Sequence, residues 1–384
     1  MPLSLAPESQ ALTIGLMSGT SLDGLDGVLL RWRAGDHRFD TLSRARGDFD
    51  PVLRAELLSL NTSGPDELHR AALAANRMSV DAADVVQRLL QQAGVQAQDV
   101  AAIGLHGQTV RHRPGEFDGR GYTLQLHNAS LLAELSSIDV VCDFRSRDVA
   151  AGGQGAPLVP AFHADVFQEA ERDVAVLNLG GIANLTLLPA HGDVGGFDCG
   201  PANVLMDLWA HQHLGRAYDD QGHWAATGRV QSALLQHWQG EAFFSKPPPK
   251  STGRDLFNAA WLQAVDLSAY QPQDVQATLC ELSAWCVDDH MARELPSAAH
   301  LWVCGGGTFN GAVMQRLEHR LRLRLGTTAT VSSTQAAGMG PLDVEAAAFA
   351  WLARRFLQGQ VGNVVRVTGA RGPRVLGALY PSRR

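Results

Sequence analysis

The sequence predicts a two-domain α/β protein, and two observations support this class. The chain has 384 residues, more than one ordinary hydrophobic core accommodates. An apolar strand, a turn of small residues and a second strand occur at residues 12–32 and again at residues 174–188, and helical spacing follows each occurrence. We therefore expect an N-terminal domain at residues 1–160, joined by a C-terminal return at residues 341–384, and a second domain at residues 161–340.

The individual elements follow from hydrophobic periodicity. Strands are expected at residues 12–17, 27–32, 100–105, 122–126, 139–142, 174–179, 183–188 and 301–303. Helices are expected at residues 53–60, 67–93, 129–135, 201–213, 311–323 and 341–357. The longest of these should end at Gly94, since glycine commonly terminates a helix. Its candidate core positions are Ala71, Leu73, Met78, Val80, Val85, Leu89 and Leu90.

Composition and charge exclude several classes of protein. A content of 45% hydrophobic and 18% charged residues is typical of a globular protein. The formal charge of −7 argues against a nucleic-acid partner. The chain has no apolar run near the roughly 18–20 residues of a membrane helix and no signal-peptide pattern at its start. Its five cysteines form no CxxC pair, which favours reduced thiols and a cytoplasmic location.

A scarcity of lysine narrows the ways in which the chain can bind phosphate. Lys246 and Lys250 are its only lysines, and both flank a run of prolines. A Walker A loop and a protein-kinase fold each need a lysine in another context. The surrounding stretch at residues 241–254 has no periodicity and reads either as a loop that closes over a ligand or as a plain connection.

Three glycine-rich turns at strand ends are the candidates for a backbone phosphate site. The turn at residues 19–24 offers small side chains, hydroxyls and N–H groups, although an ordinary hairpin turn would look the same. Asp23 or Asp26 beside it can supply oxygen ligands for Mg²⁺. The second turn contains Gly180 and Gly181, with tight packing as the alternative explanation. The third, residues 305–307, enters a helix and suits an adenine or ribose lying against the backbone.

Two isolated carboxylates are candidates for chemistry. Asp198 lies between glycines just before an expected helix, where it can act as a general base or cap the helix. Glu345 lies near the start of an otherwise apolar helix, where it either faces solvent or points into a cleft.

Polar groups for a sugar follow the strand at residues 100–105. The sequence His106-Gly-Gln-Thr109 can hydrogen-bond sugar hydroxyls. Arginines at residues 143–148 can bind a carboxylate in bidentate fashion or form a surface ion-pair cluster. His106 and His112 lack an evident third ligand, which disfavours a metal site.

Taken in order, these motifs resemble those of the anhydro-N-acetylmuramic acid kinase family. The resemblance runs from Thr13 almost to the end of the chain, and it is specific because GLMSGTSLDG at residues 15–24 occurs together with GFDCGP at residues 196–201. The other matching stretches are residues 106–109, 143–160, 178–184, 250–254, 304–310 and 377–381.

The resemblance implies an actin/hexokinase-like (ribonuclease H-like) fold with ATP and substrate in the cleft between two domains. It also implies a kinase that uses ATP and water to open 1,6-anhydro-N-acetylmuramic acid and yields N-acetylmuramic acid 6-phosphate, in cell-wall (murein) recycling in the bacterial cytoplasm. Alternatives are an actin-like amino-sugar kinase acting on a free hydroxyl and a regulator that uses ATP only to switch domain angle. A homodimer is compatible with either kinase.

The resemblance assigns roles to individual positions of this chain. Asp198 would activate the attacking water, and Glu345 would help to hold the sugar. Gln108 and Arg147 join Glu345 as expected sugar residues because of their own hydrogen-bonding groups. Asp23 is the candidate Mg²⁺ ligand. The residues expected to contact ATP are Gly19, Thr20, Ser21, Leu22, Asp23, Gly24, Leu25, Asp26, Gly180, Gly181, Gly305, Gly306 and Gly307.

Overall fold

The protein divides into two compact units, each with its own hydrophobic core. The computed structural model describes residues 12–19, 22, 24–33 and 38–382. The first unit comprises the chain up to Val166 and again from Asp343, and the second comprises Phe167–Leu342. The chain therefore leaves the first unit once and returns to it near its end.

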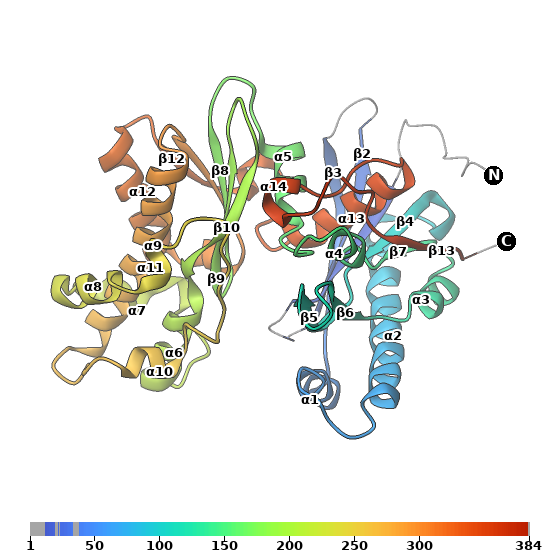
Figure 1. Ribbon diagram of the computed structural model, residues 1–384, viewed down its shortest axis with the longest axis horizontal. Coiled ribbons are helices and arrows are strands. Elements are labelled where there is room, and N and C mark those ends of the chain that lie inside the picture. Colours follow the sequence, from blue (N-terminus) through green and yellow to red (C-terminus); the bar gives the residue numbers. More distant parts are fainter. Residues whose placement is uncertain (1–11, 20–21, 23, 34–37, 383–384) are drawn as a thin grey trace. The chain divides into compact units, whose positions relative to one another are not determined.

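A mixed sheet forms the centre of the first unit (Figure 1). Its described strands lie in the order β13-β7-β4-β1-β2-β3. Strands β1, β2 and β3 form an antiparallel meander, while β4 pairs parallel to β1 and β7 parallel to β4. The strands span β1 Leu12–Met17, β2 Gly24–Trp32, β3 Phe39–Asp48, β4 Val100–Leu105, β7 Val140–Cys142 and β13 Ala378–Tyr380.

Helices cover both faces of this sheet. The long helix α2 packs on the β2–β3 side together with α3, and α13 packs on the opposite face over β1 and β4. Gly15 and Gly104 are register partners beneath α13, and a Cβ at either would overlap a backbone carbonyl of that helix. The two glycines therefore let α13 lie directly on the sheet. The helices span α1 Pro51–Ser59, α2 Glu67–Ala93, α3 Ala129–Ser136, α4 Ser146–Ala150, α5 Val159–Phe167, α13 Val344–Leu357 and α14 Val365–Thr368, with the short η1 at Ala97–Asp99.

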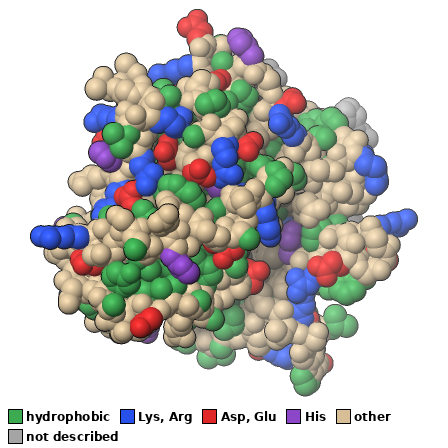
Figure 2. Space-filling model, turned by 60° about the vertical axis from the view of Figure 1, so that its left-hand side comes forward, with side chains coloured by type: hydrophobic (Ala, Val, Ile, Leu, Met, Phe, Trp, Pro, Cys, Tyr) green, Lys and Arg blue, Asp and Glu red, His purple; other side chains and the backbone are tan. Residues whose placement is uncertain are grey.

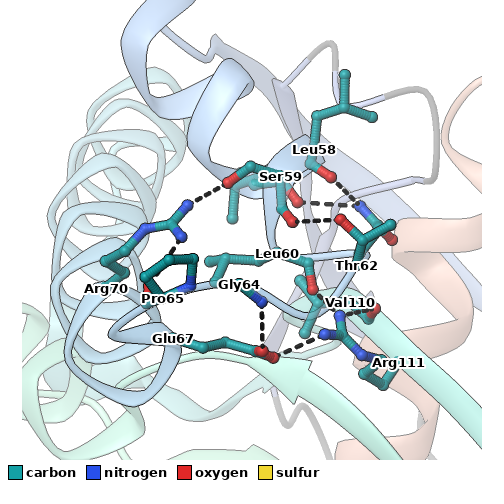
Figure 3. Close-up of polar contacts among 12 residues, drawn as sticks. Leu58, Ser59, Leu60, Thr62, Gly64, Pro65, Glu67, Arg70, Val110 and Arg111 are labelled. Carbon is teal, nitrogen blue, oxygen red and sulfur yellow. Dashed lines mark hydrogen bonds and ion pairs between the residues drawn. The ribbon is translucent and has the colours of Figure 1, made fainter.

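A separate hairpin, β5 (Gln108–Pro114) and β6 (Gly121–Leu126), follows β4 in the chain. Arg111 of β5 fixes it to the segment between α1 and α2 (Figure 3). Its guanidinium donates to the carbonyl oxygen of Leu60 and, at 2.7 Å, to Glu67 at the start of α2. Arg70 holds the same segment through Pro65, at 3.2 Å, and Ser59. Strand β5, which begins with Gln108, is thus anchored to the segment between α1 and α2.

The second unit repeats the same topology (Figure 1). Its described strands lie in the order β10-β9-β8-β11-β12, with β8, β9 and β10 as an antiparallel meander and β11 and β12 parallel to β8. The strands are β8 Val174–Leu179, β9 Ile182–Leu188, β10 Gly195–Pro201, β11 His300–Cys304 and β12 Thr330–Ser333. The helices are α6 Asn203–Leu214, α7 His223–Thr227, α8 Ser232–Gln239, α9 Ala242–Ser245, α10 Ala259–Gln263, α11 Pro272–Glu294 and α12 Gly311–Leu325, with short turns η2 Asp220–Gly222, η3 Gly306–Phe309 and η4 Thr334–Ala337.

Several elements differ from the sequence expectations. The strands β3, β5 and β10 and the helix α11 were not expected, and β10 matters most because it carries Asp198. Its glycines and proline give no strand signal, and pairing with β9 imposes the extended conformation. On α2, Leu73 and Val80 are exposed rather than buried.

Three further features concern the helices, the surface charges and the cysteines. In the part of the chain that the structure describes, no helix is long and apolar enough to cross a bilayer. Basic and acidic side chains are interspersed on the face shown in Figure 2. All five cysteines are buried and free.

Candidate active site

Asp198 lies in the middle of β10, opposite Asn184 of β9. Asn184 Nδ2 donates to Asp198 Oδ1 at 2.9 Å, and the backbone N–H of Thr252 donates to Oδ2 at 3.0 Å. The pairing of β9 and β10 shifts register just after Asp198, which sets this carboxylate at an irregular point of the sheet edge. Both of its oxygens are therefore held in place by separate donors.

The loop that supplies Thr252 is anchored by a lysine. Lys250 Nζ donates to the carbonyl oxygens of Phe243 at 2.9 Å and Phe244 at 3.3 Å, and it lies 4.5 Å from the centroid of the Phe243 ring. The carbonyl oxygen of Lys250 accepts from the backbone N–H of Asp198 at 3.2 Å. These contacts of the ammonium group hold the segment around residue 250 in place, and the segment in turn supports Asp198.

Burial and hydrogen bonding act in opposite directions on the pKa of Asp198. Desolvation of the half-buried side chain is the larger effect and raises the pKa above its ordinary value of 3.8, while the donors from Asn184 and Thr252 lower it. The desolvation makes the carboxylate a better proton acceptor than a solvated aspartate. These are the properties of a general base.

The glycine turns of the second unit fall into two groups. A Cβ at Gly306 would meet nothing within 4 Å, and at Gly180 and Gly181 the nearest atoms are 3.7 and 3.8 Å away. A Cβ at Gly305 would lie 2.7 Å from the carbonyl oxygen of Leu179, and one at Gly307 would lie 2.7 Å from Leu179 Cβ. Packing therefore explains Gly305 and Gly307, whereas Gly306 leaves open space beside the backbone and Gly180 and Gly181 have only ordinary van der Waals neighbours.

The turn at Gly180 and Gly181 lies against the start of α6. Their carbonyl oxygens accept from the backbone N–H groups of Ala202, Asn203 and Val204 at 3.0–3.1 Å. In the third turn, Asn310 caps α12 by accepting from Ala312 N at 3.1 Å and Val313 N at 3.2 Å. Each turn is fixed by its own helix, so an approaching ligand would meet preformed backbone.

A buried polar network occupies the first unit at the end of β1. Ser18 Oγ donates to Gln108 Oε1, and the backbone carbonyl of Ser18 accepts from Nδ1 of His106 at 3.2 Å. Nε2 of His106 in turn accepts from Nε and Nη2 of Arg145 at 3.1 and 2.9 Å. Ser18, His106 and Gln108 are all buried. The network joins the turn after β1 to residues that follow β4 and β7.

Glu345 lies in the first turn of α13, near enough to Arg145 and Asp26 for their charges to act on it. Desolvation raises its pKa most, Arg145 lowers it, and Asp26 raises it again. The pKa of Arg145 is lowered to about 10 by desolvation, against the opposing influence of Glu345 and Asp148. Glu345 is half-buried, so its side chain is not fully exposed to solvent.

The turn between β1 and β2 is described in part. Gly19 accepts through its carbonyl from Leu22 N at 3.2 Å, and Leu22 and Leu25 point into the core. A Cβ at Gly24 would overlap the carbonyl of Gly47 on β3, so this glycine is needed for strand packing. Asp26 is half-buried. Thr20, Ser21 and Asp23 lie outside the described residues.

The residues expected to bind the sugar do not all lie together in the structure. Gln108 belongs to the first-unit network, and the charge of Glu345 acts on Arg145 of that network. Arg147 is exposed on α4, and its side chain makes no hydrogen bond or ion pair within the described chain. Asn184, Thr252 and Ser18 were not singled out from the sequence, and Arg145 was considered there only as one of the arginines at residues 143–148. The sequence could have indicated these residues only through their position in or near a motif, because the pairing of strands and the course of the loops decide which side chains come into contact.

Two units that share one strand order, an antiparallel meander followed by parallel strands, define the actin/hexokinase-like class of phosphotransferases, which the sequence resemblance implied. Within that class, the chain belongs to the anhydro-N-acetylmuramic acid kinase family, whose model matches residues 11–382.

Relatives named anhydro-N-acetylmuramic acid kinase match the chain over nearly its full length. The one from Variovorax paradoxus is 54% identical over 378 residues, covering 97% of this chain and 99% of the relative. The one from Bordetella petrii is 57% identical over 376 residues, covering 97% and 96%. The one from Burkholderia cenocepacia is 52% identical over 379 residues, covering 98% of each.

Proposed function

We propose that this protein converts 1,6-anhydro-N-acetylmuramic acid, ATP and water into N-acetylmuramic acid 6-phosphate and ADP, as a step of cell-wall recycling in the cytoplasm. The name of its relatives supports the substrate. The observation that supports the chemistry is Asp198, a desolvated carboxylate with both oxygens held by the donors of Asn184 and Thr252.

The substrate itself explains why a base is needed and where. O6 of the anhydro sugar is an ether oxygen with no proton to remove, so the base acts on water. Asp198 accepts a proton from water as the water oxygen bonds to C1 and the C1–O6 bond breaks. O6 takes the electron pair of that bond and attacks the γ-phosphorus, and the bond from phosphorus to the β,γ-bridging oxygen breaks to release ADP.

We propose that ATP is held mainly by backbone. Gly306 leaves open space in which phosphate or nucleoside can approach the chain, and Gly180 and Gly181 have no close packing neighbour that requires a glycine. Backbone N–H groups in such turns favour anions. In the first unit the turn from Gly19 to Asp26 takes the same role. This assignment fits a chain whose anchored Lys250 is turned toward carbonyl oxygens.

Magnesium fits the carboxylates of the first unit. Asp26 is half-buried and its charge acts on Glu345, and Mg²⁺ prefers carboxylate and phosphate oxygens as ligands. We propose that Asp26, with Asp23, helps to hold Mg²⁺ together with phosphate oxygens. Bound Mg²⁺ would neutralise charge on the transferred phosphoryl group. Gln108, Arg147 and Glu345 remain the residues proposed for the sugar.

The test is ATP consumption with matched sugars. The purified protein is incubated with ATP and either 1,6-anhydro-N-acetylmuramic acid or reducing N-acetylmuramic acid, and ADP is measured. ADP release with the anhydro sugar alone supports the proposal. Release with the reducing sugar alone would instead identify an amino-sugar kinase that acts on a free hydroxyl, and release independent of sugar would identify an ATP-driven switch.

A further inference from the structure

Arg145 is the cation at the centre of the first-unit network. It directly precedes α4, and its Nη1 donates to the carbonyl oxygen of Gly155 at 2.8 Å. Asp148 fixes Gly155 in turn by accepting from its backbone N–H at 2.8 Å, and Asp148 also accepts from Asn363 at 2.7 Å and Thr368 at 2.8 Å. The guanidinium therefore rests on a buried and fully hydrogen-bonded support.

His106 fixes the other side of the guanidinium. The carbonyl oxygen of Ser18 can only accept, so Nδ1 of His106 carries the proton that it donates there. Nε2 then has a free lone pair, which accepts from Nε and Nη2 of Arg145. The ring is held further by Phe349, whose centroid lies 4.7 Å away. A neutral histidine thus positions Arg145 without neutralising its charge.

Two donors of Arg145 remain unused. A guanidinium has five N–H groups, and the contacts with His106 and Gly155 use one each on Nε, Nη2 and Nη1. One N–H on each terminal nitrogen is left without a partner among the described residues. No carboxylate of the described chain forms an ion pair with Arg145, and Glu345 acts on it only from a greater distance. Two N–H groups on neighbouring nitrogens match the spacing of the two oxygens of an oxyanion.

We propose that Arg145 binds the carboxylate of the sugar substrate, with His106 as the residue that positions it. This inference rests on the proposed function, since it takes the lactyl carboxylate of N-acetylmuramic acid as its ligand. Gln108, already proposed for the sugar, is in the same network through Ser18. Arg145 would thereby make the enzyme selective for muramic over glucosamine sugars.

A phosphate of ATP is the competing oxyanion, because Ser18 directly precedes the β1–β2 turn. The two sources differ in a measurable way. A contact with the sugar carboxylate matters only for substrates that carry one, whereas a contact with phosphate matters for every sugar. We therefore compare kcat/KM for 1,6-anhydro-N-acetylmuramic acid and for 1,6-anhydro-N-acetylglucosamine, which has a hydroxyl in place of the lactyl ether.

In the wild type we expect the muramic substrate to be preferred, and in Arg145→Gln we expect that preference to fall by about 10- to 150-fold, the usual effect of losing a hydrogen bond to a charged group. His106→Phe, which removes the acceptor, should lower the preference in the same direction, and His106→Gln, which retains an acceptor, should restore part of it. Arg113→Gln, at an exposed arginine of β5 in the same unit, should leave the preference unchanged.

Equal losses on both sugars in Arg145→Gln would assign Arg145 to phosphate and overturn the proposal. An unchanged preference in Arg145→Gln, its loss in Arg147→Gln instead, or a wild type without preference would overturn it as well. If Arg145→Gln does not fold, Arg145→Lys and the His106 pair decide the same question. When the analogue turns over too slowly, its Kd and that of the muramic sugar, measured by calorimetry, replace kcat/KM. Absence of sugar-dependent ATP consumption with preserved binding selectivity would refute the proposed function alone.

Discussion

Replacing the carboxylate of Asp198 by an amide is the most informative single change. In the Asp198→Asn variant, the new amide oxygen can accept from Thr252 N, and the new amide nitrogen can donate to Asn184 after that side chain turns its own amide around. Both hydrogen bonds therefore survive in a neutral form that is weaker than the charge-assisted one. Removing a desolvated charge offsets part of that loss. We expect the free energy of unfolding to change by no more than about 1 kcal/mol.

The chemical effect should be far larger than the structural one. Loss of a general base lowers turnover by about 10²–10⁴-fold, which corresponds to about 2.7–5.4 kcal/mol of transition-state stabilisation. The assay is sugar-dependent ADP release at saturating ATP, with thermal unfolding and ATP affinity measured on the same preparation. A kcat within about threefold of wild type, in a folded variant, would refute the assignment of Asp198 as the base.

Three further changes probe the surroundings of the site. Asn184→Ala removes a donor that lowers the pKa of Asp198, so the pKa should rise. Because the base must be ionised, the acid limb of the pH profile of kcat/KM should move to higher pH, and an unmoved limb would show that Asn184 does not influence the base. Gly306→Val should weaken ATP binding without lowering the melting temperature, since a Cβ there meets no protein atom; unchanged ATP affinity by calorimetry in a folded variant would exclude that turn from the ATP site. Gly305→Val should instead lower the melting temperature, because the φ of +83° and the tight packing at this position exclude a side chain. Arg111→Ala should raise the KM for sugar more than it lowers kcat, because it loosens the strand that begins at Gln108, and an unchanged KM would show that the anchor is dispensable.

Much of the fold could be predicted from the sequence because apolar runs and glycine turns are local signals. The strands β1, β4 and β8 and the helix α2 lie where periodicity places them. Strand β10 could not be found this way, because its sequence GGFDCGP is extended only through pairing with β9. The exposure of Leu73 and Val80 on α2 has a similar cause, since the packing partners of a helix face are set by tertiary structure.

The candidate site was predictable as a set of residues but not as a set of contacts. Asp198 and Glu345 stand out as isolated carboxylates in glycine-rich or apolar surroundings. The donor from Thr252 comes from a loop 54 residues later in the chain, and hydrophobic periodicity cannot predict that this loop folds back onto Asp198. Arg145 and Arg147 are equivalent in the sequence, and they differ because the first lies in the His106 network while the second is exposed on α4.

The mass of the product tests the central claim most directly. The claim is that the enzyme adds both a phosphoryl group and a water molecule, with Asp198 acting on the water. After incubation with ATP and 1,6-anhydro-N-acetylmuramic acid, mass spectrometry should show a sugar heavier than the substrate by one phosphoryl group plus one water. A phosphorylated sugar that lacks the added water, and so retains the anhydro bridge, would contradict the account.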